Sequence, residues 1–225
     1  MLLILSVALS YLIGSIPSAY ILGRLAKGID IRKHGSGNVG ATNAFRVLGP
    51  CIGITVLFLD GLKGLICVAP LADFIIQQGL GPVALPIGRQ TTGLCLDSLL
   101  LRILLGIAAV AGHSLTIFLR FKGGKGMATT LGVLIGFALK FPALKIILLA
   151  EILLWLAVFS ISRIVSLASI VSAALFPVFF IILKQPIPLI LMALTLAIFV
   201  IIRHKSNIYR LLHKQEPRLN LRRKP

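Results

Sequence analysis

The chain has 225 residues, of which 58% are hydrophobic and 13% charged, and its mean hydropathy is +1.03. Because soluble domains are about 45–50% apolar and about 25% charged, this composition excludes a soluble globular protein and predicts an integral membrane protein. Its 23 Lys and Arg outnumber 6 Asp and Glu, and in short loops beside membrane spans such charge favours anionic lipids or substrates over nucleic acid.

The apolar segments predict an all-α membrane protein with about seven spans in a single domain, residues 1–225. Each segment is expected to cross a bilayer of about 30 Å, and the first lacks the basic start of a cleavable signal peptide. The fourth is short, and Pro142 leaves open one long kinked or re-entrant element in place of the fourth and fifth. The predicted spans are residues 2–22, 50–76, 99–119, 126–140, 143–160, 164–183 and 187–202.

The loops between these spans differ in charge. The positive-inside rule places the more basic side in the cytoplasm and the N-terminus outside. Merging the fourth and fifth spans would divide the basic loops between both faces, so seven spans are favoured. Residues 77–98 then form an extended outer loop, and residues 203–225 a basic cytoplasmic tail. The cytoplasmic loops are residues 23–49, 120–126, 161–163 and 203–225.

The first cytoplasmic loop is rich in glycine, hydroxyl and amide groups. Gly35, Gly37 and Gly40 fit the G-x-G-x-x-G pattern, but membrane spans flank them instead of a βαβ unit, so a dinucleotide site is rejected. We expect the loop to wrap an anion with backbone donors, while an arginine adds a charge-assisted pair. An ordinary flexible loop is the alternative. The candidate substrate-binding residues are Gly37, Asn38, Thr42, Asn43 and Arg46.

The second predicted span contains an acid and a base. Asp60 and Lys63 are three residues apart and therefore share a helical face. Burying either ion alone is costly, so the expectation is a structural ion pair that braces a nearby site. Polar residues within a membrane also occur at functional sites.

The segment from Arg120 to Thr130 joins two apolar runs and combines three cations with three glycines. Glycines let backbone N–H groups approach an anion, and the following helix presents the positive end of its dipole. A topology signal with a flexible turn is the alternative. His113, which precedes this loop, either touches the site or satisfies a buried carbonyl. The candidate substrate-binding residues are Lys122, Gly123, Gly124, Lys125 and Gly126.

A third basic cluster lies where the last span ends. His204 and Asn207 share a face if the helix continues, and Arg203 lies beside them. A histidine at this position is often a polar end-cap, but next to an amide and arginines it becomes a candidate for orienting or polarising a reacting phosphate. Arg163, at the remaining cytoplasmic turn, is expected to add another cation to the same site. The three cysteines show no metal or redox spacing, so no metal site is predicted.

Taken together, these motifs make the chain similar to the bacterial acyl-phosphate:glycerol-3-phosphate acyltransferase family over almost its whole length. This resemblance implies a seven-helix inner-membrane enzyme that transfers an acyl group from acyl phosphate to the 1-hydroxyl of glycerol 3-phosphate, giving lysophosphatidic acid and phosphate. It implies no cofactor, no nucleic acid and no obligatory protein partner. The motifs that carry it are Gly14-Ser15-Ile16-Pro17, residues 35–46, residues 59–64, Gly112-His113 with residues 121–130, and residues 203–208.

The resemblance also implies roles for single residues. It implies Ser36, His204 and Asn207 as catalytic residues, Arg46 in the acyl-phosphate site and Gly123 to Gly126 around a phosphate. Glu216 matches a glutamate of structural importance. The chain departs from the family at Leu115-Thr116, where a Phe-Pro pair is usual, at Lys214, where glycine is expected, and in the long stretch 71–102.

Two mechanisms and two other function classes stay open. The glycerol hydroxyl attacks directly while His204 or a substrate phosphate takes the proton, or Ser36 forms an acyl-enzyme. An anion or phosphate-ester transporter would show charges distributed through the bundle or an inverted repeat. A scaffold that holds anionic lipids would need only Lys and Arg.

Overall fold

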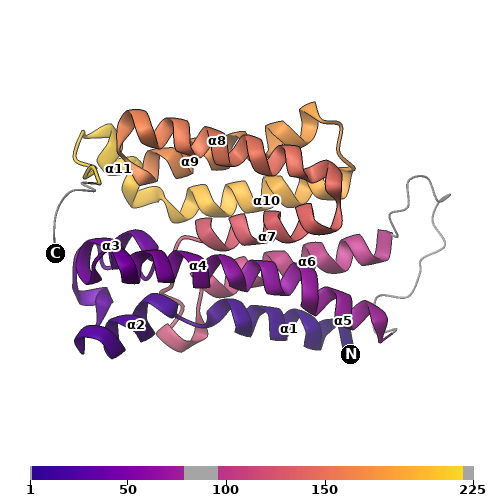
Figure 1. The fold of residues 1–225 in the computed structure, drawn as a ribbon, viewed down its shortest axis with the longest axis horizontal. Helices are drawn as coiled ribbons and strands as arrows, with labels where there is room; N and C mark the ends of the chain where they lie inside the picture. The colour runs from indigo at the N-terminus through magenta and orange to yellow at the C-terminus, as the bar shows by residue number, and fades with distance from the viewer. Residues whose placement is uncertain (1, 79–95, 220–225) are drawn as a thin grey trace.

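The structure is a computed structural model that describes residues 2–78 and 96–219, and the regular elements of these residues are all helical (Figure 1). The predicted outer loop 77–98 and the last six residues of the basic tail lie mainly outside this part of the chain. The helices are α1 (Leu2–Ser15), α2 (Ser18–Lys27), α3 (Ala41–Leu48), α4 (Pro50–Ile66), α5 (Ala72–Gln77), α6 (Leu96–Ser114), α7 (Met127–Lys140), α8 (Lys145–Ser162), α9 (Val165–Ile182), α10 (Ile187–Arg203) and α11 (Lys205–Leu212).

Every predicted span is helical, which confirms the all-α membrane class. Helices α10 and α11 form a further apolar pair that is bent by 61°. Helix α7 has only 14 residues, or ~21 Å, which is shorter than a hydrocarbon core of about 30 Å. A count of seven full spans therefore stays a prediction. Five helical runs among the described residues are long and apolar enough to cross a membrane: Leu2–Lys27, Pro50–Gln77, Ser98–Leu119, Pro142–Ser162 and Val165–Ile182.

Pro142 separates two helices and does not kink one long helix. It starts the short 3₁₀ turn Pro142–Leu144. Helices α7 and α8 run in opposite directions on the two sides of this turn (Figure 1). The proline ring cannot continue the hydrogen-bond pattern of α7, so the chain reverses here and returns toward the basic end.

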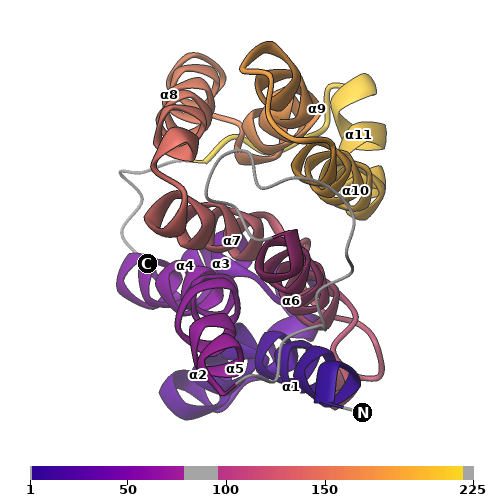
Figure 2. The ribbon, with the colours of Figure 1, turned by 90° about the vertical axis from the view of Figure 1, so that its right-hand side faces the viewer.

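The bundle has two groups of helices with α6 and α7 between them. Figure 2 shows α8, α9 and α10 on one side and α1, α2, α4 and α5 on the other. Close contacts are made by glycine: a Cβ on Gly14 would collide with the Ala109 carbonyl on α6, and one on Gly132 would collide with the Gly61 carbonyl on α4. Membrane helices associate through such small residues, because lipid offers no hydrophobic drive between them.

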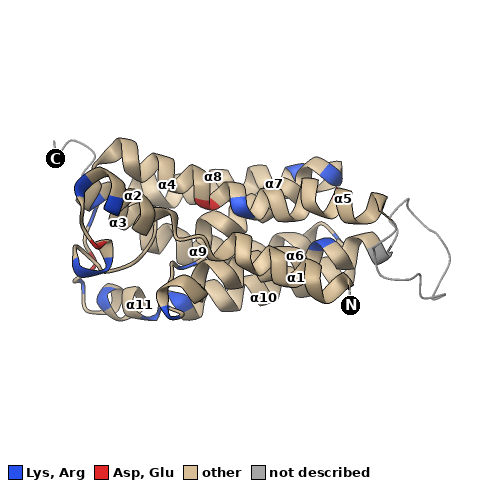
Figure 3. Ribbon diagram, turned by 90° about the horizontal axis from the view of Figure 1, so that it is seen from below, with Lys and Arg blue, Asp and Glu red and all other residues tan. Residues whose placement is uncertain are grey.

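Basic residues gather at one end of the bundle. Figure 3 shows Lys and Arg around α2, α3 and α11, with a smaller group beside α5 at the other end. In that smaller group Arg102 donates a hydrogen bond of 2.5 Å to Asp73. Asp73 also pairs with Lys140. The larger group, on the predicted cytoplasmic loops, surrounds the cavities described next.

Candidate active site

A cavity of about 400 Å³ runs from the basic end of the bundle into the space among α7, α8, α9 and α10. Its two ends differ in chemistry. The end near the loops is polar and is lined by Ser36, Asn38, Thr42, Asn43, Arg46, Lys125, His204, Asn207, Arg210 and Glu216. The part between the helices is largely apolar and is lined by Leu131, Leu134, Ile152, Trp155, Leu156, Phe176 and Leu196, with Glu151 and three serines of α9 among them.

A second cavity, of about 670 Å³, adjoins the first at its polar end. Seven of its lining residues are basic, so it is suited to an anion. Both cavities are lined by Ser36, Asn38, Lys125 and Arg210. The two spaces therefore meet at these four residues. The basic residues are Arg32, Lys33, Lys122, Lys125, Arg203, Lys205 and Arg210.

Lys125, Asn207 and Glu216 form a hydrogen-bonded chain across the polar end. The Lys125 amino group donates to Asn207 Oδ1 at 2.5 Å. Asn207 Nδ2 donates to Glu216 Oε1 at 2.6 Å. Ser166 and Arg210 also donate to the Glu216 carboxylate, each at 2.7 Å. This arrangement brings Lys125 and Asn207 together and places Glu216 among three hydrogen-bond donors.

The pKa values of these groups reflect burial and the local charges. Burial lowers the pKa of Lys125 to about 8, and Arg210, Arg46 and Arg203 act in the same direction against the opposing effect of Glu216. For Glu216, burial acts to raise the pKa, but the hydrogen bonds that it accepts outweigh this effect and hold the pKa below its usual range. The polar end thus holds an ionised acid beside an amine whose charge a bound anion would stabilise.

His204 lies between α10 and α11 and is 3% exposed. Its Nδ1 is 2.8 Å from the Val200 carbonyl oxygen. Since a carbonyl only accepts hydrogen bonds, Nδ1 carries the proton in this contact, and Nε2 is the nitrogen with a lone pair. The chain bends by 61° between α10 and α11, so the helix does not continue straight from His204 to Asn207. The backbone N–H of Asn207 still donates to the backbone carbonyl of His204 at 2.8 Å. The side chains of both residues line the first cavity.

The first loop holds its shape through Asn43. Asn43 Oδ1 accepts from the Ser36 amide at 2.9 Å, while its Nδ2 donates to the carbonyls of Ile31 and His34. Both ends of the Asn43 amide are therefore engaged in bracing the loop, and Ser36 stays exposed where the cavities meet. Gly37 has a φ of +70°, a conformation that glycine adopts without strain.

The glycine loop departs from the expected phosphate cradle. The Gly123 amide donates to the Ser114 carbonyl and the Gly124 amide to the His113 carbonyl, each at 3.1 Å. These two N–H groups therefore do not face an anion, which corrects that expectation. A Cβ on Gly124 would collide with the His113 ring, so close packing explains this glycine. Arg203 donates to the carbonyls of Gly123 and Gly124 at 3.4 and 3.2 Å.

The remaining residues of this loop line the cavities. Lys122 and Gly123 line the basic cavity. Gly126 has a φ of +86° and precedes the first turn of α7 at the wall of the first cavity. The N-terminus of α7 thus lies beside Lys125, where its dipole favours a negative charge.

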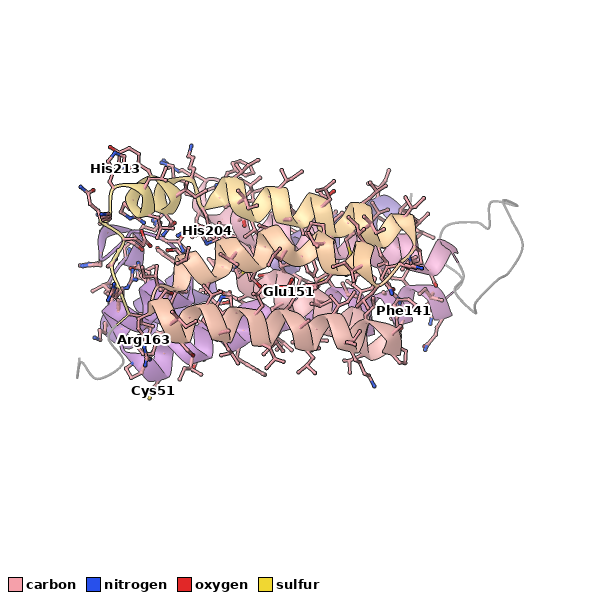
Figure 4. The ribbon with its side chains drawn as sticks, turned by 90° about the horizontal axis from the view of Figure 1, so that it is seen from above. Cys51, Phe141, Glu151, Arg163, His204 and His213 are labelled. Atoms are coloured by element: carbon pink, nitrogen blue, oxygen red, sulfur yellow. The ribbon has the colours of Figure 1, made fainter. Side chains whose placement is uncertain are left out.

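Arg163 is not brought to either cavity, which corrects the predicted contribution of this cation. It is exposed, and it caps α8 in the left-handed conformation with a φ of 59°. Figure 4 shows it at the end of α8, away from His204. Its carbonyl accepts from the Leu219 amide at 2.8 Å, so it anchors the tail. Ser166, three residues later, is the residue of this turn that reaches the site, through Glu216.

The intramembrane pair is confirmed. Lys63 Nζ lies 2.6 Å from Asp60 Oδ1 and also donates to the Ile16 carbonyl at 2.5 Å. His113 Nδ1 is 3.6 Å from the same carboxylate, and the ring lines the first cavity. The Lys63–Asp60–His113 group thus lies directly behind the glycine loop, as a brace.

Comparison with known proteins adds independent evidence. Residues 4–214 match the family model described as glycerol-3-phosphate acyltransferase. The chain is 42% identical to a glycerol-3-phosphate acyltransferase of Trichormus variabilis, over 95% of this chain and 90% of the relative. It is 40% identical to the protein of the same name from Bacillus subtilis, over 97% of this chain and 98% of the relative.

Solved structures give the same result. A crystal structure of PlsY (YgiH), described as an integral membrane glycerol 3-phosphate acyltransferase in its glycerol 3-phosphate form, matches with a TM-score of 0.79. The identity is 35%, and the match covers 97% of this chain and 96% of that one. Its lysophosphatidic acid form matches with a TM-score of 0.76 and 34% identity, over 97% of this chain and 95% of that one.

Proposed function

Since the chain belongs to the glycerol-3-phosphate acyltransferase family, we propose that the acyl donor for its reaction is an acyl phosphate and that the reaction takes place where the two cavities meet. The protein is a multi-pass membrane enzyme that transfers an acyl group to glycerol 3-phosphate and gives lysophosphatidic acid. The donor, the site residues and the side of the membrane are the parts of this proposal that need tests.

The shape of the first cavity supports this donor. One end carries Arg46 and Lys125, and the other runs between apolar side chains of four helices. An acyl phosphate has a matching arrangement, because its charged phosphate is joined directly to a long apolar chain. Charge-assisted hydrogen bonds would hold the phosphate, and burial of the chain would supply the apolar part of the binding energy.

The basic cavity supports the position of the acceptor. Lys122, Arg203 and Lys205 line it but do not line the first cavity, while Ser36 and Lys125 line its junction with the first cavity. A glycerol 3-phosphate with its phosphate among the first three residues would direct its far hydroxyl toward the junction. The hydroxyl and the acyl carbon would then meet beside Ser36.

The proposed reaction is a direct acyl transfer. The 1-hydroxyl oxygen forms a bond to the acyl carbon, the bond from that carbon to the phosphate oxygen breaks, and phosphate leaves with the electron pair. His204 Nε2, which has the lone pair, takes the hydroxyl proton. Two phosphates bring together about four negative charges, which repel strongly in a partly dry site, and Lys125, Arg46 and Arg203 offset this repulsion. Because an acyl phosphate is an activated anhydride, Ser36 orients the reactants without forming a covalent intermediate.

We further propose that the site faces the cytoplasm of the inner membrane. The loops and the tail that form it carry most of the Lys and Arg (Figure 3), and the positive-inside rule assigns such loops to the cytoplasm.

The test is acyl transfer by the purified protein in detergent with radiolabelled glycerol 3-phosphate. Palmitoyl phosphate is expected to give labelled lysophosphatidate, and palmitoyl-CoA to give none. His204→Gln is expected to lower kcat on the order of 10²-fold or more through loss of the base, whereas Lys145→Ala, an exposed change far from both cavities, keeps full activity. Product from palmitoyl-CoA alone would reject the proposed donor. An acyl group trapped on Ser36 would replace direct transfer by a two-step route.

A further inference from the structure

Glu151 is a carboxylic acid within a membrane-spanning helix, and the reaction described above does not use it. It lies on α8, inside the span Pro142–Ser162, and is 6% exposed. Figure 4 shows it between α8 and α9, deeper in the bundle than His204. An ionisable side chain at such a position is rare and usually has a function.

Only one of its two carboxyl oxygens has a partner. Oε2 accepts a hydrogen bond from the Ser172 hydroxyl on α9, whereas Oε1 has no hydrogen-bond partner among the described residues. One turn away, Trp155 Nε1 donates to Ser169 Oγ at 3.2 Å and already links α8 to α9. The Glu151–Ser172 hydrogen bond therefore adds a second link between the same two helices and leaves Oε1 without a partner in the part of the chain that the structure describes.

Glu151 lies at the deep end of the first cavity. It is the lining residue of α8 that is farthest from the polar end, and Leu134, Phe176 and Leu196 hold the same place on α7, α9 and α10. From Gly126 to Leu134 the cavity extends eight residues along α7, or ~12 Å, and from Leu156 to Glu151 it extends five residues along α8, or ~8 Å. This depth is shorter than an extended palmitoyl chain.

We propose that Glu151, held by Ser172, is the residue that limits the length of the acyl chain. It makes part of the cavity floor polar. A hydrocarbon chain long enough to press its methyl end on Glu151 would exclude water from a carboxyl group whose Oε1 is already buried without a partner among residues 2–78 and 96–219, and it would offer that oxygen no hydrogen bond, which is unfavourable. Chains that end above the floor avoid this cost. The inference rests on the proposed function, because the cavity must hold the acyl chain.

The test compares chain-length profiles. The values of kcat/KM are measured for lauroyl, myristoyl, palmitoyl and stearoyl phosphate with the wild-type enzyme, Glu151→Met and Glu151→Gln. Methionine matches glutamate in length and is apolar, whereas glutamine keeps hydrogen-bonding groups. In Glu151→Met the ratio of stearoyl to myristoyl phosphate is expected to rise by about tenfold, in the range that a few methylenes contribute to specificity. Glu151→Gln keeps the wild-type ratio.

A binding measurement covers variants with little activity. Displacement of radiolabelled lysophosphatidate by lysophosphatidates of the same four chain lengths measures how binding depends on chain length without any turnover. Glu151→Leu serves as a second apolar variant. No turnover of any acyl phosphate by the wild type would reject the proposed donor, while the displacement series would still test the floor.

Three results would overturn the inference. The first is an unchanged chain-length profile in both apolar variants. The second is an equal shift in Glu151→Gln, which would make the effect independent of polarity. The third is a wild-type preference for a hydroxylated chain over a plain chain of equal length that is lost in Glu151→Met, which would make Glu151 a binding site for polar acyl chains.

Discussion

At the scale of single residues, the site depends on Lys125. This amine lines both cavities and donates to Asn207. Burial lowers its pKa to about 8, whereas the guanidinium groups nearby keep their charge at any physiological pH. Lys125 is therefore the cation of the site whose charge responds to pH.

The first prediction is a pH dependence of kcat/KM. The charged amine is present below its folded-state pKa and is lost as the pH rises through about 8. Since kcat/KM reports the free enzyme, kcat/KM for glycerol 3-phosphate is expected to be maximal below pH 8 and to decline above it. Lys125→Arg, which keeps the charge, is expected to remove the decline. The measurement is a pH series for both proteins, and an identical decline in both would assign it to another group.

Lys214 shows how a departure from the family pattern appears in the structure. The resemblance leads us to expect glycine at this position, and Lys214 adopts a left-handed backbone with a φ of 57°. Glycine takes this conformation without strain. The tail nevertheless places Glu216 among Ser166, Asn207 and Arg210, so the three hydrogen bonds hold the tail in place despite the strained residue.

At the scale of elements, the glycine loop is fixed by packing against the end of α6. Its amides donate to the carbonyls of His113 and Ser114, and the close approach leaves no space for a side chain at Gly124. The loop thus places Lys125 by means of a rigid connection, and not by wrapping an anion with the amides of Gly123 and Gly124.

The second prediction tests this packing. Gly124→Ala is expected to displace the loop and to lower acyltransferase activity at least on the order of 10²-fold, because small misplacements of catalytic groups are costly. Gly61→Ala, within α4, is the matched control, because its Cβ would meet only the Ala128 carbonyl oxygen at an ordinary 3.6 Å. The measurement is activity at equal amounts of folded protein, and equal activity of the two variants would contradict the packing argument.

The third prediction concerns the Asp60–Lys63 pair on α4. Removing one member leaves an unpaired charge inside the membrane, so Asp60→Leu or Lys63→Met alone is expected to destabilise the protein by about 3–5 kcal/mol. The double variant is expected to recover most of this loss. Thermal unfolding in detergent of the two single variants and the double variant measures the coupling. Simple additivity of the two single effects would show that the ions do not stabilise each other.

At the scale of the whole molecule, the site is made by segments that are far apart in the sequence. The Lys125–Asn207 hydrogen bond joins residues 82 positions apart, and the Arg46–Pro217 contact joins residues 171 apart. Among the described residues the bundle brings the larger group of Lys and Arg to one end, while the apolar walls of four helices extend the first cavity into the membrane. One cavity can therefore take a charged group and an acyl chain together.

The fourth prediction tests the orientation of the bundle. Single cysteines are placed at Lys33, at the rim of the basic cavity, and at Lys145, at the opposite end, in a background without the three native cysteines. A membrane-impermeant maleimide is expected to label position 145 in intact cells and position 33 only after permeabilisation. The reversed pattern would place the site outside. Acyltransferase activity of each single-cysteine protein is the control for folding.

Much of the site was predictable because its chemistry is local. Glycines, cations, His204 and Asn207 cluster in short loops between apolar runs, and such contrasts are visible in a linear sequence. Glu151 gave no such signal. It lies on a uniformly apolar helix, where periodicity does not indicate which face meets a cavity. Arg163 was assigned to the wrong place because a cation at the correct end of the bundle can still point away from the site.

By itself the sequence determined that this protein is a helical membrane protein with basic loops on one side, because hydrophobicity and charge act residue by residue. It also indicated the Asp60–Lys63 pair, which a helical spacing of three residues dictates. Only the tertiary structure decided which groups meet. In the folded protein the amides of Gly123 and Gly124 donate to backbone carbonyls of α6, and Arg163 lies outside both cavities. Glu216 lies among its hydrogen-bond donors, and Glu151 lies at the floor of the first cavity. These outcomes depend on contacts between helices, and such contacts are fixed only when the bundle packs.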